Sequence, residues 1–141
     1  MKPRIVLDTN VLVSALRSRS GASFQVLSRV GLGRFDIVLS VPLVLEYESV
    51  TKRLSRSMGL THEDIDDILD YLCRVGILRG IFYLWRPVLR DPKDDMVLEA
   101  AVEGGCGFIV THNIDDFTGC ASFGVQAIRP AGFLRILEER P

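Results

Sequence analysis

The strongest constraint on the fold is a short apolar run near the amino terminus that ends in an aspartate. Residues 5–7 are apolar, Asp8 follows at once, and apolar residues then recur at helical spacing from Val11. This pattern is typical of a strand, buried on both faces, that leads directly into a helix. Ligands bind at the carboxyl ends of strands in open α/β sheets, so Asp8 either binds a ligand or caps the next helix.

Apolar periodicity predicts that strands and helices alternate along the chain. We expect strands at 4–8, 36–40, 77–84, 108–111 and 126–128, and helices within 10–18 and 22–31, at 42–54, 61–75 and 93–103, and from 130 onward. Alternation of this kind indicates a parallel sheet with helices on both faces. The length of 141 residues is that of one ordinary domain, 1–141, and a hydrophobic content of 48% argues against disorder.

A second acidic residue, Glu46, lies on the helix predicted at 42–54. Ser40 is a plausible N-cap and Pro42 suits a first helical turn. One apolar stripe is formed by Leu43, Tyr47, Val50 and Leu54. At about 100° per residue, Glu46 lies roughly 80° from the centre of this stripe and Glu48 about 120° from it. We therefore place Glu46 at the edge of the buried face and Glu48 in solvent.

A third acidic position opens the helix predicted at 93–103. Asp94 precedes Val97 by three residues and Leu98 by four, so it points along the apolar stripe, whereas Asp95 lies on the flank. The helix dipole favours a carboxylate in a first turn, which is the alternative explanation for both residues. That explanation does not account for the position of Asp94 on the inward face of the helix.

A fourth polar cluster follows the strand predicted at 108–111. Thr111, Asn113 and Asp116 come directly after the apolar run, where an ordinary Asx-rich turn is the alternative. Carboxylates that converge at one sheet edge repel one another, and a divalent cation removes that cost. Oxygen ligands select Mg²⁺ or Mn²⁺, which suit phosphodiester hydrolysis.

Four motifs together resemble the PIN domain family. They are Asp-Thr-Asn at 8–10, the glutamate at 46, Asp-Pro-Lys-Asp-Asp at 91–95 and Val-Thr-His-Asn-Ile-Asp-Asp-Phe at 110–117. The chain is most similar to the PIN-domain toxins of toxin–antitoxin systems related to VapC, over essentially its whole length. This resemblance implies a three-layer α/β/α sandwich with a central, mainly parallel sheet.

The resemblance also implies the residues of the site. Asp8, Asp94 and Asp116 would hold one or two Mg²⁺ or Mn²⁺ ions, and Glu46 would complete the cluster or orient the attacking water. Asp95 is the alternative third acid. Many relatives carry Asp where this chain has Asn113, so the fourth acid is expected at Asp116. The supporting residues would be Thr9, Asn10, Thr111 and Asn113.

The activity implied is that of a metal-dependent endoribonuclease without a covalent intermediate. Its partners would be an RNA substrate, a cognate antitoxin and a second copy of the chain in a homodimer. Two alternatives stay open: a non-catalytic PIN module that binds RNA or protein, and a nuclease for RNA maturation. The apolar helix from residue 130 packs either on the core or on a second subunit.

Other enzyme classes fit less well. Haloacid-dehalogenase-like phosphatases need a second Asp at the place of Asn10, and response-regulator receivers need an acidic pair and a late lysine, yet no lysine follows Lys93. Ser-His-Asp or Cys-His catalysis has only His62 and His112 to draw on. His112 either touches substrate or serves in packing.

Charge and composition set further bounds. A net charge of −1 and a pI near 6.1 are not those of a general nucleic-acid coat protein. Local basic residues either contact phosphates or form a solvated face: Arg17, Arg19, Lys52, Arg53 and Arg56. No apolar run approaches the ~18 residues of a membrane span, and no signal pattern opens the sequence, so we expect a cytoplasmic protein. We expect reduced, semi-buried and inert thiols at Cys73, Cys106 and Cys120.

Overall fold

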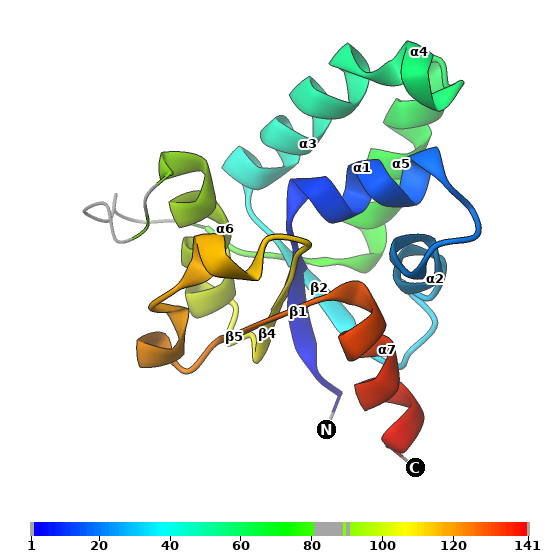
Figure 1. Cartoon of the computed structure of the whole chain (residues 1–141). Helices are drawn as coiled ribbons and strands as arrows, with labels where there is room; N and C mark the ends of the chain where they lie inside the picture. The colour runs from blue at the N-terminus through cyan, green and yellow to red at the C-terminus, as the bar shows by residue number, and fades with distance from the viewer. Residues whose placement is uncertain (1, 81–88, 90, 141) are drawn as a thin grey trace.

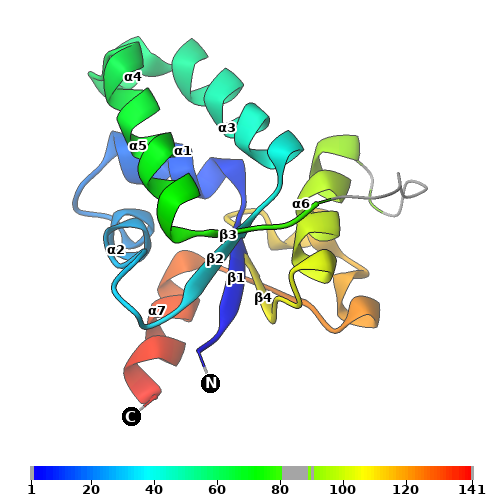
Figure 2. The same cartoon turned by 180° about the vertical axis from the view of Figure 1, so that it is seen from behind.

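A sheet of five parallel strands forms the centre of the fold, with helices on both sides (Figures 1 and 2). The structure is a computed structural model, and it describes residues 2–80, 89 and 91–140. The strands are β1 (Arg4–Leu7), β2 (Asp36–Leu39), β3 (Ile77–Leu78), β4 (Phe108–Val110) and β5 (Gln126–Ile128). Their order across the sheet is β3-β2-β1-β4-β5, and every neighbouring pair is parallel. The α/β sandwich predicted from the sequence is confirmed.

The helices form two layers and a cap above the carboxyl edge of the sheet. Helix α6 (Pro92–Glu103) lies on one side, and α2 (Ala22–Ser28) and α7 (Pro130–Glu139) lie on the other (Figures 1 and 2). Helix α1 (Thr9–Arg17) packs on α2, while α3 (Val41–Arg53) packs on α5 (His62–Val75) and also reaches α1 and α6. Three short elements complete the fold: α4 (Ser55–Met58), η1 (Ile114–Phe117) and η2 (Cys120–Phe123).

Most predicted elements are confirmed, with two differences. The helix expected within 22–31 is α2, which ends at Ser28, and Gly31 then turns the chain with a φ of +85°. This positive φ favours glycine, and a Cβ at Gly31 would also meet the Tyr71 hydroxyl. The strand expected at 77–84 ends at Leu78, and its residues 81–84 lie outside the described part of the chain. Helix α4 was not predicted.

The helix starts follow the capping chemistry that the sequence predicts. The Ser40 hydroxyl accepts a hydrogen bond from the Leu43 backbone N–H at 3.2 Å, with Pro42 in the first turn of α3. Thr61 and Asp64 form a reciprocal capping box at the start of α5. Such a cap contributes about 1 kcal/mol to stability. The Ser40 cap fixes where α3 begins, and hence the direction in which Glu46 points.

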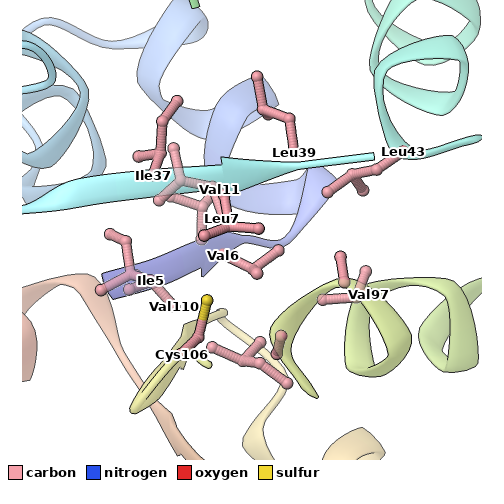
Figure 3. Packing of buried hydrophobic residues seen from close by; sticks show 14 of the residues in the cluster. Ile5, Val6, Leu7, Val11, Ile37, Leu39, Leu43, Val97, Cys106 and Val110 are labelled. Carbon is pink, nitrogen blue, oxygen red and sulfur yellow. The ribbon is translucent and has the colours of Figure 1, made fainter. Parts of the chain in front are cut away.

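The hydrophobic core lies along both faces of β1. Ile5 and Val6 are fully buried, as expected for a central strand of a parallel sheet. Figure 3 shows Leu7 and Val11 close to Leu39 of the neighbouring strand, with Val97 of α6 on the other side. The sheet is therefore packed tightly beneath the point where Asp8 emerges.

Helix α7 packs on the core of its own subunit. Phe133 is fully buried, and its ring meets Phe35 edge-on with 5.2 Å between the ring centroids. Leu134 and Leu137 are buried as well, whereas Ile136 is half-buried. Burial of each such side chain contributes about 1.5–3 kcal/mol. The sequence left open whether this helix packs on the core or on a second subunit. Phe133, Leu134 and Leu137 pack on the core.

All three cysteines are free thiols, as predicted. Cys106 and Cys120 are buried, and burial raises the pKa of Cys106 to about 12, so this thiol stays protonated at neutral pH. Cys73 is exposed rather than semi-buried, because it lies on the outer face of α5. Among the described helices, none combines the length and apolarity needed to cross a membrane.

Candidate active site

The strand order reverses beside β1, and this reversal creates the candidate site. The chain runs from β1 outward to β2 and β3, then returns to add β4 and β5 on the other side of β1. Helices leave such neighbouring strands in opposite directions, and a crevice opens at the carboxyl ends. Asp8 directly follows β1 and Thr111 directly follows β4. Both residues that the sequence predicts at strand ends therefore lie at the same crevice.

Asp8 is held by two hydrogen bonds at the carboxyl end of β1. Its Oδ1 accepts from the Thr9 backbone N–H at 2.8 Å, and its Oδ2 accepts from the Thr111 hydroxyl at 2.8 Å. Only 8% of Asp8 is exposed. Burial raises the pKa of Asp8, and repulsion from Asp116 adds to this, although the two hydrogen bonds oppose the shift. Asp8 is thus both the helix cap and a fixed, buried carboxylate.

A buried tyrosine supports the strand end beneath Asp8. The Tyr47 hydroxyl donates a hydrogen bond to the Leu7 backbone carbonyl, and only 1% of Tyr47 is exposed. Burial and the nearby Asp8 charge both raise the pKa of Tyr47, so its phenol stays protonated and remains a donor. The sequence analysis placed Tyr47 only in an apolar stripe. The sequence could have indicated a polar role for Tyr47, because a tyrosine has a hydroxyl that a leucine or phenylalanine in the same stripe lacks.

A cavity of about 550 Å³ opens over this strand end. It gathers all four acids that the sequence predicts, one from each of four segments of the chain: Asp8, Glu46, Asp94 and Asp116. Thr9, Asn10 and Asn113 also line the cavity. Thr111 lies beneath Asp8, fully buried. The structure therefore brings the predicted acids to one place, although they are separated by up to 108 residues.

Asp94 and Asp95 differ in their surroundings. Asp94 lines the cavity, and its pKa is raised to about 6 by burial and by the charges of Asp8, Asp116, Asp91 and Asp95. Asp95 is 7% exposed, and its Oδ1 accepts a hydrogen bond from the Leu89 backbone N–H at 2.9 Å. Asp95, which the sequence places on the flank of the helix, is therefore buried. Helix α6 contacts β1, β2, β4, α3 and η1, so more than one of its sides is buried.

Glu46 lies at the edge of the buried face of α3, as predicted. Its side chain is 20% exposed, against 43% for Glu48. The Glu46 carboxylate is 3.8 Å from the Lys93 ammonium, and both residues line the cavity. Lys52 instead forms ion pairs with Glu48 at 3.2 Å and with Asp66 at 2.7 Å. Of these two lysines, Lys93 is the one that lines the cavity.

The loop after β4 is tied to the neighbouring helices. The Thr111 hydroxyl accepts a hydrogen bond from the Asn113 backbone N–H at 3.0 Å, and the Asn10 side chain accepts one from the His112 backbone N–H at 3.3 Å. His112 Nε2 lies 2.9 Å from the hydroxyl of Ser23, a residue only 3% exposed. These contacts fix the loop that carries Asp116. They favour the packing role for His112.

The donor chemistry of the cavity fits a hard divalent cation. Its candidate ligands are carboxylate oxygens, which Mg²⁺ and Mn²⁺ prefer. Within the described residues, no three side chains of His, Cys, Asp or Glu form a group that could hold a metal ion. Mg²⁺ commonly keeps several water ligands and takes only one or two carboxylates directly. The residues present suit binding of that kind, in which the other carboxylates act through water.

The crowding of carboxylates predicts a pH-dependent stability for the metal-free protein. The pKa of Asp94 is about 6 in the folded protein against an ordinary 3.8, so the folded state binds more protons between these values. Stability conferred by this group is thus greatest below about pH 4 and is lost as the pH rises through 6. We expect Asp94→Asn to unfold at a higher urea concentration than wild type at pH 7.5, with the difference disappearing by pH 4.

This prediction is checked with urea unfolding midpoints, measured in EDTA across that pH range. Asp115→Asn is the matched control, because Asp115 is exposed in η1 and does not line the cavity. A wild-type midpoint that rises between pH 4 and 6 relative to Asp94→Asn would contradict the prediction.

The parallel sheet has helices on both faces and an acidic cavity where its strand order reverses, so the protein is an α/β protein with a candidate metal site. The comparison of sequences gives the family. A family model described as "PIN domain" matches residues 4–115, about four fifths of the chain. The chain belongs to the PIN domain family. The match includes Asp8, Glu46 and Asp94 and ends one residue before Asp116. PIN domains of this kind are generally nucleases that use divalent metals.

Known structures show the same fold. One similar structure is that of VapBC2 from Rickettsia felis bound to a DNA fragment from their promoter, with a TM-score of 0.59 and 14% sequence identity. The likeness covers 89% of this chain and 98% of the other. At this identity the likeness is one of fold. No curated protein sequence matches the chain.

Proposed function

We propose that the protein is a divalent-metal-dependent endoribonuclease that hydrolyses RNA phosphodiester bonds, and that it is the toxin of a toxin–antitoxin pair. One observation carries the proposal: Asp8, Asp94 and Asp116 share a cavity at the switch point of the sheet. They are close enough that the charges of Asp8 and Asp116 help to raise the pKa of Asp94 to about 6. Carboxylates arranged in this way favour a bound cation.

Asp8, Asp94 and Asp116 would hold Mg²⁺ or Mn²⁺, with Glu46 at the edge of the cluster. The metal supplies charge that polarises the phosphoryl group and lowers the pKa of an attacking water. Thr111 and the Thr9 backbone N–H keep the Asp8 carboxylate in one orientation. Both oxygens of Asp8 are thereby fixed before the substrate arrives, which is the advantage of a preorganised site.

Glu46 is suited to positioning the attacking water. Its carboxylate is partly exposed in the cavity and lies 3.8 Å from the Lys93 ammonium. An ionised carboxylate can accept a proton from water directly, so a covalent intermediate is not required. Lys93, 64% exposed, would remain free to approach a phosphate oxygen of the substrate.

The proposed role as a toxin is supported by the PIN domain family and by the similar structure of VapBC2. The chain resembles the VapC toxins in its motifs, and VapBC2 of Rickettsia felis shares its fold. An antitoxin that covers the cavity and a homodimer as the working form belong to the same proposal. Light scattering of the purified chain, alone and with its antitoxin, measures both associations.

The proposal is tested by a pair of adjacent aspartates. Asp115 and Asp116 both lie in η1 and are both exposed, but only Asp116 lines the cavity. We expect the wild type to cleave RNA in Mn²⁺ and to stop in EDTA. Asp116→Asn should lower the cleavage rate by at least ~10-fold, since even residues that support metal ligands contribute this much. Asp115→Asn should cleave at the wild-type rate.

Three readouts separate the alternatives. Calorimetry with Mn²⁺ measures metal binding, a labelled RNA measures cleavage, and growth of cells that express the chain measures toxicity. Growth arrest relieved by Asp116→Asn supports a toxin, whereas cleavage without growth arrest favours an RNA-maturation nuclease. Metal binding without cleavage of any RNA favours a non-catalytic module. A wild-type protein that binds no Mn²⁺ contradicts the metal site itself.

A further inference from the structure

The cavity has a second half that the carboxylates do not use. Its lining residues there come from α1, α3 and the residues that follow each helix. The two helices contact each other, and both lie above the sheet in Figure 1. The lining of this half is apolar and hydroxylic with a single arginine: Val13, Ser14, Arg17, Ser18, Val50 and Leu54. The acidic half thus combines several carboxylates with Lys93, while the second half carries Arg17 and no carboxylate.

The helical geometry explains why these side chains share one wall. On α1 the lining residues are Thr9, Asn10, Val13, Ser14 and Arg17, most of which recur at intervals of three and four. On α3 they are Glu46 and Val50, followed by the C-cap Leu54, each one turn from the last. Residues at these intervals lie on one face of a helix. Along each helix, the lining residues thus continue from the acidic half into the second half.

Arg17 is placed at a distance from the acidic cluster. Nine residues separate it from Asp8, which is about 13 Å along the helix axis. Arg17 would therefore meet a different phosphate from the one that the carboxylates flank. Its side chain is exposed, and one guanidinium nitrogen lies 3.4 Å from the Ser57 hydroxyl, near the upper limit for a hydrogen bond. A guanidinium has five N–H donors, so this contact leaves others for a bidentate phosphate bond.

We propose that this half of the cavity is a subsite for one nucleotide of single-stranded RNA, next to the bond that is cut. Arg17 binds the phosphate of that nucleotide. The apolar side chains Val13, Val50 and Leu54 pack on its base, and the hydroxyls of Ser14 and Ser18 face its ribose. The proposal rests on the proposed function, because it names how the same cavity holds the substrate.

The test measures binding without cleavage. A fluorescent single-stranded RNA is titrated with Asp8→Asn protein in EDTA at several salt concentrations, with and without Arg17→Ala. Each phosphate contact on a single strand adds about 0.7 to the slope of log affinity against log salt. Loss of one contact should lower that slope by about 0.7, which makes binding about fivefold weaker at 0.1 M salt than in the parent.

Two control variants distinguish a phosphate contact from other roles. Ser57→Ala removes the neighbour of Arg17 in α4 but keeps the guanidinium, so it should bind RNA as the parent does. Arg53→Ala removes an exposed arginine from the end of α3 that does not line the cavity, and it should also bind normally. The subsite is refuted if Arg17→Ala binds as the parent does, if either control weakens binding as much, or if the parent binds no RNA.

A competition experiment tests the base-binding wall. Adenosine monophosphate should displace the RNA at a lower concentration than ribose 5-phosphate does, and Leu54→Ala should narrow the difference. Equal competition by the two compounds would exclude a base contact. None of these measurements requires cleavage, so loss of the subsite and loss of nuclease activity are separate results. If the wild type cleaves RNA but Arg17→Ala does not weaken RNA binding, the proposed subsite is wrong and the proposed function still stands.

Discussion

Replacing Asp8 with asparagine is expected to lower metal-dependent RNA cleavage by more than about 100-fold while the fold stays intact. Supporting partners of metal ligands already contribute 10–100-fold, and Asp8 is proposed as a direct ligand. The substitution preserves the shape of the side chain and keeps one oxygen that can accept from Thr9. It also removes one charge from a crowded cluster, so the metal-free variant should unfold at no lower a urea concentration than wild type.

The measurement is single-turnover cleavage of a labelled RNA in Mn²⁺, with calorimetry for metal binding and urea unfolding for the fold. Asp36→Asn is the matched control, because Asp36 opens β2 at the opposite, amino edge of the sheet, where it pairs with Lys2 at 3.2 Å. We expect Asp36→Asn to cleave normally. An Asp8→Asn protein that cleaves at the wild-type rate would show that the metal site has been placed wrongly.

The site residues that the sequence identified share a local signal. Asp8 follows a strand whose last three residues are apolar, and Glu46 lies six residues after the N-cap Ser40 of its helix. Periods of two or 3.6 residues place such side chains on a face without any knowledge of distant contacts. This is why the difference between Glu46 and Glu48 could be predicted from angles alone.

The difference between Asp94 and Asp95 needed the tertiary structure. The angular argument assumes that a helix has one buried side, which is true of α5 but not of α6. Because α6 packs on the sheet, on α3 and on η1, both aspartates are partly or fully buried. What separates them is the contact between Asp95 and the Leu89 backbone, six residues away across the start of the helix. No periodic pattern contains that contact.

The contacts between residues far apart in the chain could not be predicted from the sequence either. Tyr47 reaches Leu7 across 40 residues, and Ser23 reaches His112 across 89. Both depend on the order of the strands, which alternation alone does not specify, because β4 could have been added at either edge of the sheet. Placement of β4 beside β1 is what brings Thr111 to Asp8.

Thr111 provides the second large expected effect, which is a loss of metal binding through a residue that is not itself a proposed ligand. Its hydroxyl donates to Asp8 at 2.8 Å and accepts from the Asn113 backbone N–H at 3.0 Å. Thr111→Val keeps the shape of this fully buried side chain but removes the donor and the acceptor. Asp8 would lose the bond that orients it, so we expect Mn²⁺ affinity and cleavage to fall by about 10–100-fold.

The same substitution should also destabilise the protein. A hydrogen bond to a charged group contributes about 1.5–3 kcal/mol, and the buried Asp8 carboxylate would lose one of its two. Urea unfolding in EDTA measures this change in the free energy of unfolding. Thr111→Ser restores the hydroxyl and should recover most of both the stability and the Mn²⁺ affinity.

The two readouts separate positioning of the carboxylate from simple packing. If Thr111 serves only to fill space, Thr111→Val will bind Mn²⁺ like wild type, and Thr111→Ser, which lacks the methyl group, will be the less stable variant. If Thr111 orients Asp8, the order is reversed: serine retains metal binding and valine loses it. The second outcome is the one expected, because the hydroxyl lies between Asp8 and the loop that carries Asn113 and Asp116, and so links two strand ends at the switch point.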